Sequence, residues 1–438
     1  MSIFFLNRCY WPDSEATGQL LTELCEFLAP RWDVTAVVGQ PNWDTENEGF
    51  VLAGIQERNG VRIHRLLHSK LPKGQRFARI RNLISFTLAV RKWGKQFAKQ
   101  VRQNGSSATP LLVCETDPFL LPLVVGPLAR KTKSRVVYYL QDIYPDVAVA
   151  VGVSKNNFFI RMLRSRLKNE YLKADAIVVL DEDMRDRLVG WGLPAERMKI
   201  VPNWMDCSVV RPIKSNNSFR IEQKLSDRFV VMHSGNMGMT QRLDVLVDAM
   251  RLMSLGSGNE ELSKYERSRE GHGSESRTTL SRTTLMLVGN GAKRASLEEH
   301  AHGLENVRFL DYQPREKLSE SLSAADLHVV SMDQAITGCL APSKLYGILA
   351  SGTPVLAIVP KGNAVWRLVE QEKLGWTVEP GDTAAIAKAI HEAESLDRKS
   401  LAEMGQRGRV LAEKLFDKRI CCEAFEDIIK QTAEPKLP

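Results

Sequence analysis

Residues 230–238 read Val-Val-Met-His-Ser-Gly-Asn-Met-Gly, and an amphipathic run begins shortly afterwards at Leu243. The apolar first half predicts a buried strand, and apolar residues at helical spacing from Leu243 onward predict a helix. Backbone N–H groups in a glycine-containing turn between them can approach a phosphate at the positive end of the helix dipole. The sequence therefore predicts an anion-binding loop, with a ligand-free turn as the alternative. Its predicted contacts are Ser234, Gly235, Asn236 and Gly238.

Two further glycine loops follow predicted strands. Gly289 and Gly291 come directly after the next strand of the same series, and Thr17 and Gly18 follow the strand at the start of the chain. Parallel sheets of this class bind ligands at the carboxyl ends of their strands. Three such loops together favour a ligand site, although each glycine alone is equally typical of a structural turn.

Around these loops, short β-branched and aromatic runs alternate with helical segments, which predicts the α/β class with parallel sheets. The first series of strands covers residues 2–6, 33–38, 111–114, 135–140 and 176–180. The second covers 229–233, 285–288, 307–310, 327–331 and 354–358. The chain of 438 residues is long enough for two domains, which we place at 1–205 and 206–417. The polar stretch 203–228 is the predicted linker.

The second domain is expected to carry an insert at 255–284. This segment is rich in Ser, Gly, Glu and Arg, and the sequence Ser-Arg-Thr-Thr-Leu occurs twice in tandem, at 276–280 and 281–285. Such a composition predicts a largely disordered surface loop.

Composition excludes several classes of protein. No uncharged apolar run reaches the roughly 18 residues of a membrane span, and the first residues do not resemble a signal peptide. The seven cysteines are scattered without zinc-site spacing. We therefore expect a cytoplasmic protein without a metal site or cofactor.

Polar residues at two other strand ends are candidate site residues. Gln141 and Asp142 follow the strand 135–140, where an amide and a carboxylate could orient sugar hydroxyls or move a proton. Asp146 is either a functional carboxylate or a helix N-cap. Asn203 and Trp204 follow the short strand 199–201, and either line a pocket or pack at a hinge.

A lysine stands at an unfavourable place in the second domain. Ser343 is expected to cap the helix that follows, which puts Lys344 in its first turn, where a cation opposes the helix dipole. A bound phosphate would remove this conflict. Lys344 is therefore predicted to bind an anion.

The net charge of +8 is regional, since residues 59–114 hold twelve Lys or Arg and no Asp or Glu. A helix there has an apolar face running from Leu83 to Val101, and a second basic, apolar segment covers Lys155 to Lys173. We expect an anionic membrane surface as the partner rather than nucleic acid, because no nucleic-acid-binding motif accompanies the charge. The predicted membrane-facing residues are Arg91, Lys92, Trp93, Lys95 and Lys99.

These motifs occur together, and in this order, in a known family. The segments that carry the resemblance are 11–18, 141–142, 202–204, 234–238, 288–291 and 342–355. The chain resembles family-4 glycosyltransferases of the GT-B fold, in particular those of O-antigen, capsule and colanic-acid-type exopolysaccharide synthesis, including fucosyl- and aminofucosyltransferases. The resemblance implies two Rossmann-like domains facing a central cleft, with a C-terminal helix, within 418–438, that completes the first domain. It also implies that the first domain binds the acceptor and the second the nucleotide sugar.

The chain departs from that family at the donor site. A Glu-x7-Glu pair that binds ribose in many members is replaced by Cys339 and Gly347, and the usual diphosphate-binding cations are replaced by Asn236 and by Thr240 or Gln241. Lys344 and Arg242 are the cations that remain near the expected diphosphate, with Ser343 beside them.

The sequence thus predicts a glycosyltransferase on the inner face of the cell membrane. It would move a hexose or deoxyhexose, with retention of configuration, from a nucleotide diphosphate sugar to a lipid-linked or growing polysaccharide acceptor. Gln141, Asp142 and Lys344 are the predicted catalytic residues. A GT-B nucleotide-sugar epimerase and a non-catalytic scaffold related to transferases are the alternatives.

Overall fold

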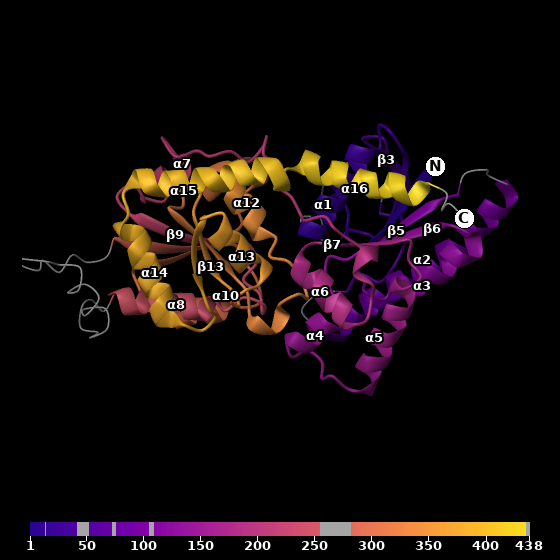
Figure 1. Cartoon of the computed structure of the whole chain (residues 1–438), viewed down its shortest axis with the longest axis horizontal. Helices are drawn as coiled ribbons and strands as arrows, with labels where there is room; N and C mark the ends of the chain where they lie inside the picture. The colour runs from indigo at the N-terminus through magenta and orange to yellow at the C-terminus, as the bar shows by residue number, and fades with distance from the viewer. Residues whose placement is uncertain (14, 42–51, 72–75, 105–108, 255–281, 435–438) are drawn as a thin grey trace, which may run out of the picture. The chain divides into compact units, whose positions relative to one another are not determined.

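The computed structural model describes the chain except for residues 14, 42–51, 72–75, 105–108, 255–281 and 435–438. Most of the predicted insert therefore lies outside the described residues. The chain forms two compact units (Figure 1). The first contains Met1–Asn203, Gly338–Ala341 and Arg419–Pro438, and the second contains Trp204–Thr337 and Pro342–Lys418. None of the described helices is both long enough and apolar enough to cross a membrane.

The first unit is built on an eight-stranded sheet in the order β3-β4-β2-β1-β5-β6-β7-β8. Neighbouring strands are parallel except for β3 and β4, which form an antiparallel pair at the edge. The strands in chain order are β1 (Ser2–Leu6), β2 (Asp33–Val38), β3 (Gly54–Arg58), β4 (Val61–Arg65), β5 (Leu111–Glu115), β6 (Arg135–Tyr139), β7 (Ala176–Val179) and β8 (Met198–Ile200).

Helices cover both faces of this sheet because its central strands are apolar on both sides. Phe4 of β1 contacts Trp93 on one face, whereas the adjacent Phe5 contacts Phe425 on the other. On the Phe4 face, α2 packs on α3 and α3 on α5. The helices of the unit are α1 (Ala16–Leu28), α2 (Arg76–Asn104), α3 (Pro122–Thr132), α4 (Asp146–Ala150), α5 (Phe158–Tyr171), α6 (Glu182–Gly190), the 3₁₀ segment η1 (Ala195–Arg197) and α16 (Lys418–Ala433).

The second unit contains a six-stranded, fully parallel sheet in the order β11-β10-β9-β12-β13-β14. The strands are β9 (Phe229–Ser234), β10 (Thr283–Val288), β11 (Val307–Leu310), β12 (Leu327–Ser331), β13 (Val355–Ile358) and β14 (Gly375–Val378). Because β10 begins at Thr283, the second copy of the tandem repeat supplies the start of a strand. Two parallel-sheet units with crossover helices confirm the predicted fold class.

The sheet of the second unit separates two apolar cores. Val231 belongs to the core shared with α8 and α14, whereas its neighbours Val230 and Met232 belong to the core on the opposite face. The helices are α7 (Ser218–Glu222), α8 (Leu243–Ser254), α10 (Arg294–His300), α11 (Leu318–Ser323), α12 (Lys344–Ala350), α13 (Ala364–Gln371), α14 (Thr383–Ser395) and α15 (Arg398–Leu411). Shorter segments are the 3₁₀ turns η2 (Arg315–Lys317) and η3 (Gln334–Ile336) and the π-helical η4 (Ala412–Phe416).

The prediction that residues 203–228 form a linker is wrong, because most of this segment is packed in the second unit. It contains α7, and Phe219 and Leu225 are buried in the core of the second unit. Arg220 also pairs with Asp326 at 3.0 Å. The two large apolar side chains are spaced too widely among polar residues to produce a recognisable helical pattern.

Candidate functional site

The two glycine loops of the second unit pack directly on each other. Gly235 and Gly289 have φ values of +127° and +134°, in the region that favours glycine. A Cβ on Gly289 would come within 2.1 Å of the Gly235 carbonyl oxygen. The loops at the carboxyl ends of β9 and β10 therefore interlock only because both residues are glycine.

The backbone N–H groups of these loops are mostly used within the protein. Gly235 donates to the Val288 carbonyl at 2.8 Å, and Met237 donates to the Asn290 carbonyl at 2.9 Å. The N–H of Gly238 donates to the Gln241 side chain at 2.9 Å. Three of the four N–H groups of residues 235–238 therefore already have acceptors, which favours the alternative of a structural turn for these groups.

The glycines instead make room for Lys344. A Cβ on Gly235 would lie 2.6 Å from Cε of Lys344, so the lysine side chain lies against the loop where any other residue would displace it. Burial lowers the pKa of this ammonium to about 8. Among the residues that the structure describes, no carboxylate forms an ion pair with Lys344. A partly buried cation without a counter-ion is the expected partner of an anionic ligand.

His233 lies close to this lysine but does not add charge. Its ring is fully buried, with Nε2 3.4 Å from the Asn236 carbonyl oxygen and, among the residues that the structure describes, no hydrogen-bond partner for Nδ1. Burial, with a further contribution from Lys344, holds the pKa of His233 well below its usual range. Lys344 is therefore the charged group at this point of the sheet.

Two other predicted site residues of this unit, Ser343 and Arg242, make contacts that differ from the prediction. Ser343 stands at the N-cap position of α12, as expected, but it has helical backbone angles and its side chain makes no capping hydrogen bond. Arg242 donates to Asp244 at 3.3 Å and lies 4.0 Å from Asp333, which compensate its charge. Lys344 is thus the better candidate for a diphosphate.

The carboxyl edge of the first sheet carries several polar side chains that follow β5, β6 and β8. Thr116, which follows β5, accepts hydrogen bonds from the backbone N–H groups of Gln141 and Asp142 at 3.2 and 3.3 Å. The Asn203 amide donates to Gln141 Oε1 at 3.1 Å. The structure therefore brings together Gln141, Asp142 and Asn203, which the sequence placed after two different strands. Trp204 is buried, as its packing alternative requires.

Thr17 and Gly18 lie in the first turn of α1. Gly18 is buried, and a Cβ there would lie 3.2 Å from the backbone nitrogen of Tyr10. The Gly18 carbonyl accepts the Thr22 hydroxyl at 2.7 Å. These contacts explain the glycine by packing within the β1–α1 connection, and Thr17 remains half-buried beside it.

Sequence reasoning missed a set of polar groups close to this turn. Cys9 Sγ lies 3.0 Å from a carboxylate oxygen of Glu15 and 3.0 Å from one of Asp117, either of which can accept its proton, and Arg8 pairs with Asp117 at 2.8 Å. Burial raises the pKa of Cys9 well above its usual range, so the thiol keeps its proton. A protonated thiol and a carboxylate already paired with arginine are poor metal ligands. The signal that could have found Asp117 is the polar Thr-Asp pair after an apolar strand.

Asp146 is a structural residue rather than a free acid. It is buried and pairs with Arg164 at 2.7 Å and with Arg187 at 2.9 Å. It is also the first residue of α4 and not its N-cap, which is Pro145.

The basic helix α2 presents a different surface from the predicted one. Arg91, Lys92, Lys95 and Lys99 are exposed as expected. Trp93 is only 7% exposed and stacks on Phe97, so the prediction that it faces a membrane is wrong. Exposed apolar residues of α2 and α5 lie elsewhere: Ile80, Ile84 and Leu88 on the former, and Phe158, Phe159 and Met162 on the latter.

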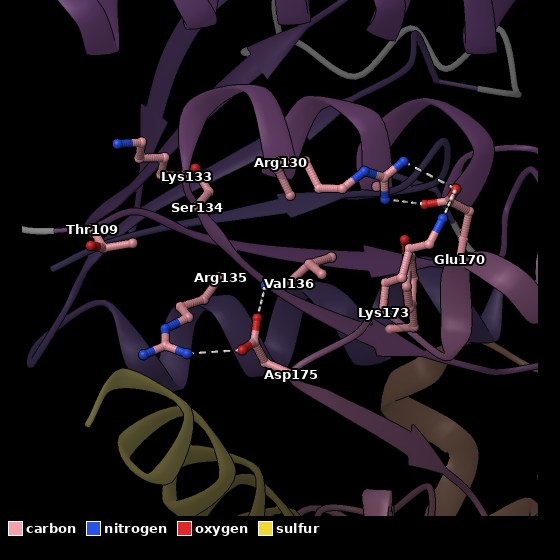
Figure 2. Close-up of a pocket in the computed structure, with 12 residues that line it drawn as sticks. Thr109, Arg130, Lys133, Ser134, Arg135, Val136, Glu170, Lys173 and Asp175 are labelled. Atoms are coloured by element: carbon pink, nitrogen blue, oxygen red, sulfur yellow. Dashed lines mark hydrogen bonds and ion pairs between the residues drawn. The ribbon is translucent and has the colours of Figure 1, made fainter. Parts of the chain in front are cut away.

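A separate pocket of about 350 Å³ opens at the amino end of β6 (Figure 2). Arg130 donates to Glu170 at 2.7 and 3.2 Å, and Arg135 donates to Asp175 at 3.0 Å. The helices α3 and α5 both end here, where cations compensate the helix dipoles. The charges of this pocket are therefore explained by the fold, and the pocket lies at the opposite strand ends from Gln141.

Comparisons with known proteins identify the class. A model described as "Glycosyl transferase 4-like domain" matches residues 16–204, and one described as "Glycosyl transferases group 1" matches residues 228–394. Together these models span most of the chain, one in each unit. The chain therefore belongs to the group 1 glycosyltransferases, which confirms the resemblance found in the sequence.

Two relatives are named as glycosyltransferases, one of them in colanic acid biosynthesis. Over 322 residues the chain is 25% identical to the "Probable glycosyltransferase WbjE" of Pseudomonas aeruginosa, covering 72% of this chain and 73% of the relative. Over 142 residues it is 25% identical to the "Putative colanic acid biosynthesis glycosyltransferase WcaL" of Escherichia coli K12, covering 32% and 34%.

Solved structures show the same fold. HepE of Anabaena, in complex with UDP, superimposes with a TM-score of 0.67 and 16% identity, over 98% of this chain and 100% of the other. Sucrose-phosphate synthase of Thermosynechococcus elongatus gives a TM-score of 0.72 and 17% identity, over 98% of each chain. The GT-B fold follows from these likenesses together with the family.

Proposed function

We propose that this glycosyltransferase moves a hexose or deoxyhexose from a nucleotide diphosphate sugar to a lipid-linked or growing polysaccharide acceptor, with retention of configuration. The observation that carries the proposal is the Lys344 ammonium, partly buried against Gly235 with no counter-ion among the described residues. Breaking the sugar–phosphate bond builds negative charge on the diphosphate, and a preorganised cation stabilises that charge. Lys344 thereby performs the task that a divalent metal would otherwise have, and we expect activity to survive chelation with EDTA.

The acceptor and the sugar would be held by the other unit. Gln141, Asp142 and Thr116 lie at the carboxyl edge of its sheet, where amide and carboxylate groups suit hydroxyl groups rather than phosphates. A UDP-sugar is the first donor to test, because a solved protein of the same fold, HepE, has been found with UDP-glucose.

The test is a melting-temperature panel with UDP-, GDP-, ADP- and CDP-sugars. A ligand present at 100 times its Kd stabilises the folded state by about 2.7 kcal/mol, so a matching donor raises Tm by several degrees. Lys344→Ala is expected to weaken that donor on the order of 100-fold and abolish the shift. Lys399→Ala, which removes an exposed lysine of α15, is the control and should keep the shift. A wild-type protein that responds to none of these nucleotides would contradict the proposal.

We also propose that the protein binds the inner face of the cell membrane through α2 and α5. Phe158 and Phe159 are 66% and 70% exposed at the start of α5, and no acidic residue occurs between Arg76 and Asn104. Exposed aromatic and aliphatic side chains beside lysine and arginine are typical of helices that lie in an anionic lipid surface.

Vesicle co-sedimentation tests this surface. Wild-type protein should sediment with phosphatidylglycerol vesicles and much less with phosphatidylcholine vesicles. The double variant Phe158→Ser/Phe159→Ser should lose most of this binding, whereas Val410→Ser, at an exposed apolar residue of the second unit, should not. Equal binding by all three proteins would count against the proposed surface.

A further inference from the structure

The exposed surface of α2 changes character along the helix. Its exposed large apolar residues all lie in the first half, at Ile80, Ile84 and Leu88, each about one turn from the next. Arg81 is exposed beside them. The second half exposes no large apolar side chain, and its exposed cations are Arg91, Lys92, Lys95 and Lys99. The helix therefore has an apolar end followed by a basic end.

The shorter helix α5 shows the same change. Its exposed large apolar residues are confined to the first half, at Phe158, Phe159 and Met162, and the connection that leads into the helix exposes Val153. The second half again exposes no large apolar residue, while Arg166 is exposed within it. Two helices far apart in the sequence thus share one arrangement of apolar and basic ends.

The topology brings the two apolar ends to the same edge of the sheet. The helix α2 follows β4, and α5 follows β6 through the short α4. Crossover helices run back from the carboxyl end of one parallel strand to the amino end of the next. The apolar ends therefore lie toward the carboxyl edge of the first sheet, and the basic ends lie toward its amino edge. The helix α3 packs against both α2 and α5, and its exposed cations Arg130 and Lys131 also stand at its end.

Carboxylates hardly interrupt the basic ends. Residues 59–114 contain no Asp or Glu, and Glu170 of α5 is only 12% exposed and pairs with Arg130 at 2.7 Å. The next crossover helix, α6, exposes Glu182 and Asp186, so the basic surface stops at α5. A cationic band beside exposed aromatic and aliphatic side chains is complementary to an anionic bilayer, which offers phosphate groups above an apolar interior.

We propose that the first unit docks on an anionic bilayer by the carboxyl edge of its sheet, with the apolar ends of α2 and α5 inserted and their basic ends outside, next to the lipid phosphates. A rise of 1.5 Å per residue places Lys95 about 10 Å beyond Leu88, which matches the depth of about 5–10 Å to which interfacial apolar faces sink. The inference rests on the proposed membrane binding and adds an orientation to it. Gln141 and Asp142 then lie at the edge that faces the lipid, where a lipid-linked acceptor presents its sugar.

Single fluorescent labels measure this orientation. All seven native cysteines are buried, so a cysteine introduced on the surface is the one that reacts with an environment-sensitive fluorophore such as NBD. Ile84→Cys and Phe159→Cys place the label at the apolar ends, and Lys99→Cys and Asn169→Cys place it in the second halves of the same helices. Ile55→Cys, at an exposed apolar residue of β3 in the same unit, is the matched control.

The proposal predicts two classes of label on phosphatidylglycerol vesicles. Labels at positions 84 and 159 should brighten and be quenched by doxyl groups on the acyl chains, because they enter the boundary between headgroups and chains. Labels at positions 99, 169 and 55 should stay dim and remain accessible to iodide in the aqueous phase.

Substitutions test the same surface through affinity for the vesicles. Ile84→Ser/Leu88→Ser should weaken binding on the order of tenfold or more, because two apolar side chains no longer leave water. Arg91→Gln/Lys95→Gln should weaken it on the order of tenfold at low salt and less at high salt. Ile55→Ser should bind like the wild type, and all of these exposed substitutions should leave Tm unchanged.

The other outcomes separate the possible failures. Equal responses of the labels at positions 84 and 99 would show that α2 lies flat on the lipid, and a response at position 55 equal to that at 84 would show that docking is not confined to these helices; either would overturn the inference and leave membrane binding in place. Vesicle binding that neither double variant weakens would overturn it as well. Wild-type protein that does not sediment with phosphatidylglycerol vesicles would overturn the proposed membrane binding, and this inference with it.

Discussion

The carboxyl ends of the two sheets occupy equivalent places in their units, yet they are built from different chemistry. In the first unit, Thr116, Gln141 and Asn203 hold one another through neutral hydrogen bonds, next to the carboxylate of Asp142. In the second unit, Gly235 and Gly289 bring two backbone loops into contact and leave a place for the Lys344 ammonium. A neutral network of donors and acceptors suits hydroxyl groups, whereas a cation without a counter-ion suits a diphosphate. One topology thus offers the two kinds of site that a sugar transfer requires.

The largest change in stability is expected for a substitution of Gly289, where two backbone loops of the second unit are in direct contact. Gly289→Ala would place a Cβ 2.1 Å from the Gly235 carbonyl oxygen, at a φ of +134°, and backbone cannot move aside as a side chain can. We expect a loss of about 3 kcal/mol or more in the free energy of unfolding, measured in urea. Gly362→Ala is the matched control, because its φ is also positive, at +76°, but a Cβ there meets nothing within 4 Å. It should cost only about 1 kcal/mol, and equal losses would refute the packing argument.

Gly235→Ala should separate stability from binding. The nearest atoms to its new Cβ belong to the flexible Lys344 side chain, at 2.6 Å from Cε. We expect a modest loss of stability, about 1–2 kcal/mol, from the positive φ, but a fall in nucleotide affinity on the order of tenfold or more because Lys344 is displaced. Titration of the variant with UDP and GDP checks this. Unchanged affinity would show that the diphosphate does not depend on the position of Lys344.

Sequence reasoning located most strands and both glycine loops of the second unit, because these features are local. Apolar runs of buried strands and glycines after them are visible within ten residues. The contacts of the glycine loop at 235–238 were not visible, since two of its N–H groups find their acceptors about 50 residues later, at the end of β10 and just after it, as with Met237 and the Asn290 carbonyl. The partner of the Gln141 amide, Asn203, likewise lies 62 positions away.

The membrane-facing residues illustrate a different reason for error. Trp93 lies on the apolar stripe of α2, and that stripe packs on the sheet, so its place in the pattern favours burial. Ile80, Ile84 and Leu88 are exposed on the same helix, but apolar periodicity cannot distinguish a stripe that faces the core from one that faces solvent. The tertiary contacts of β1 with α2 decide between them.

The pH dependence of donor binding tests the cation at the edge of the second sheet. Burial lowers the pKa of Lys344 to about 8 in the free protein, so the ammonium carries its charge below pH 8 and loses it above. Above pH 7, where the terminal phosphate of UDP or GDP is ionised, nucleotide affinity should therefore fall as pH rises past 8, approaching about tenfold per pH unit. Lys344→Arg keeps its charge throughout and should not show this fall between pH 8 and 9.5. Calorimetric Kd values for UDP or GDP across this range provide the measurement, and a parallel fall in both proteins would assign the titration to another group.

The smallest change in stability is expected for a substitution of Thr116, which tests the hydrogen bonds at the carboxyl edge of the first sheet. Thr116→Val preserves shape but leaves the N–H groups of Gln141 and Asp142 without the acceptor that they now meet at 3.2 and 3.3 Å. Two bonds lost at a partly buried edge should cost about 1–2 kcal/mol of unfolding free energy. Thr87→Val is the control, because the Thr87 hydroxyl is a donor to the Leu83 carbonyl, at 2.8 Å within a helix whose own bonds remain. It should change stability by only a few tenths of a kcal/mol. If the two variants lose equal stability, the hydrogen bonds of Thr116 do not hold this edge, and the order of the first unit must come from packing, as it does in the second.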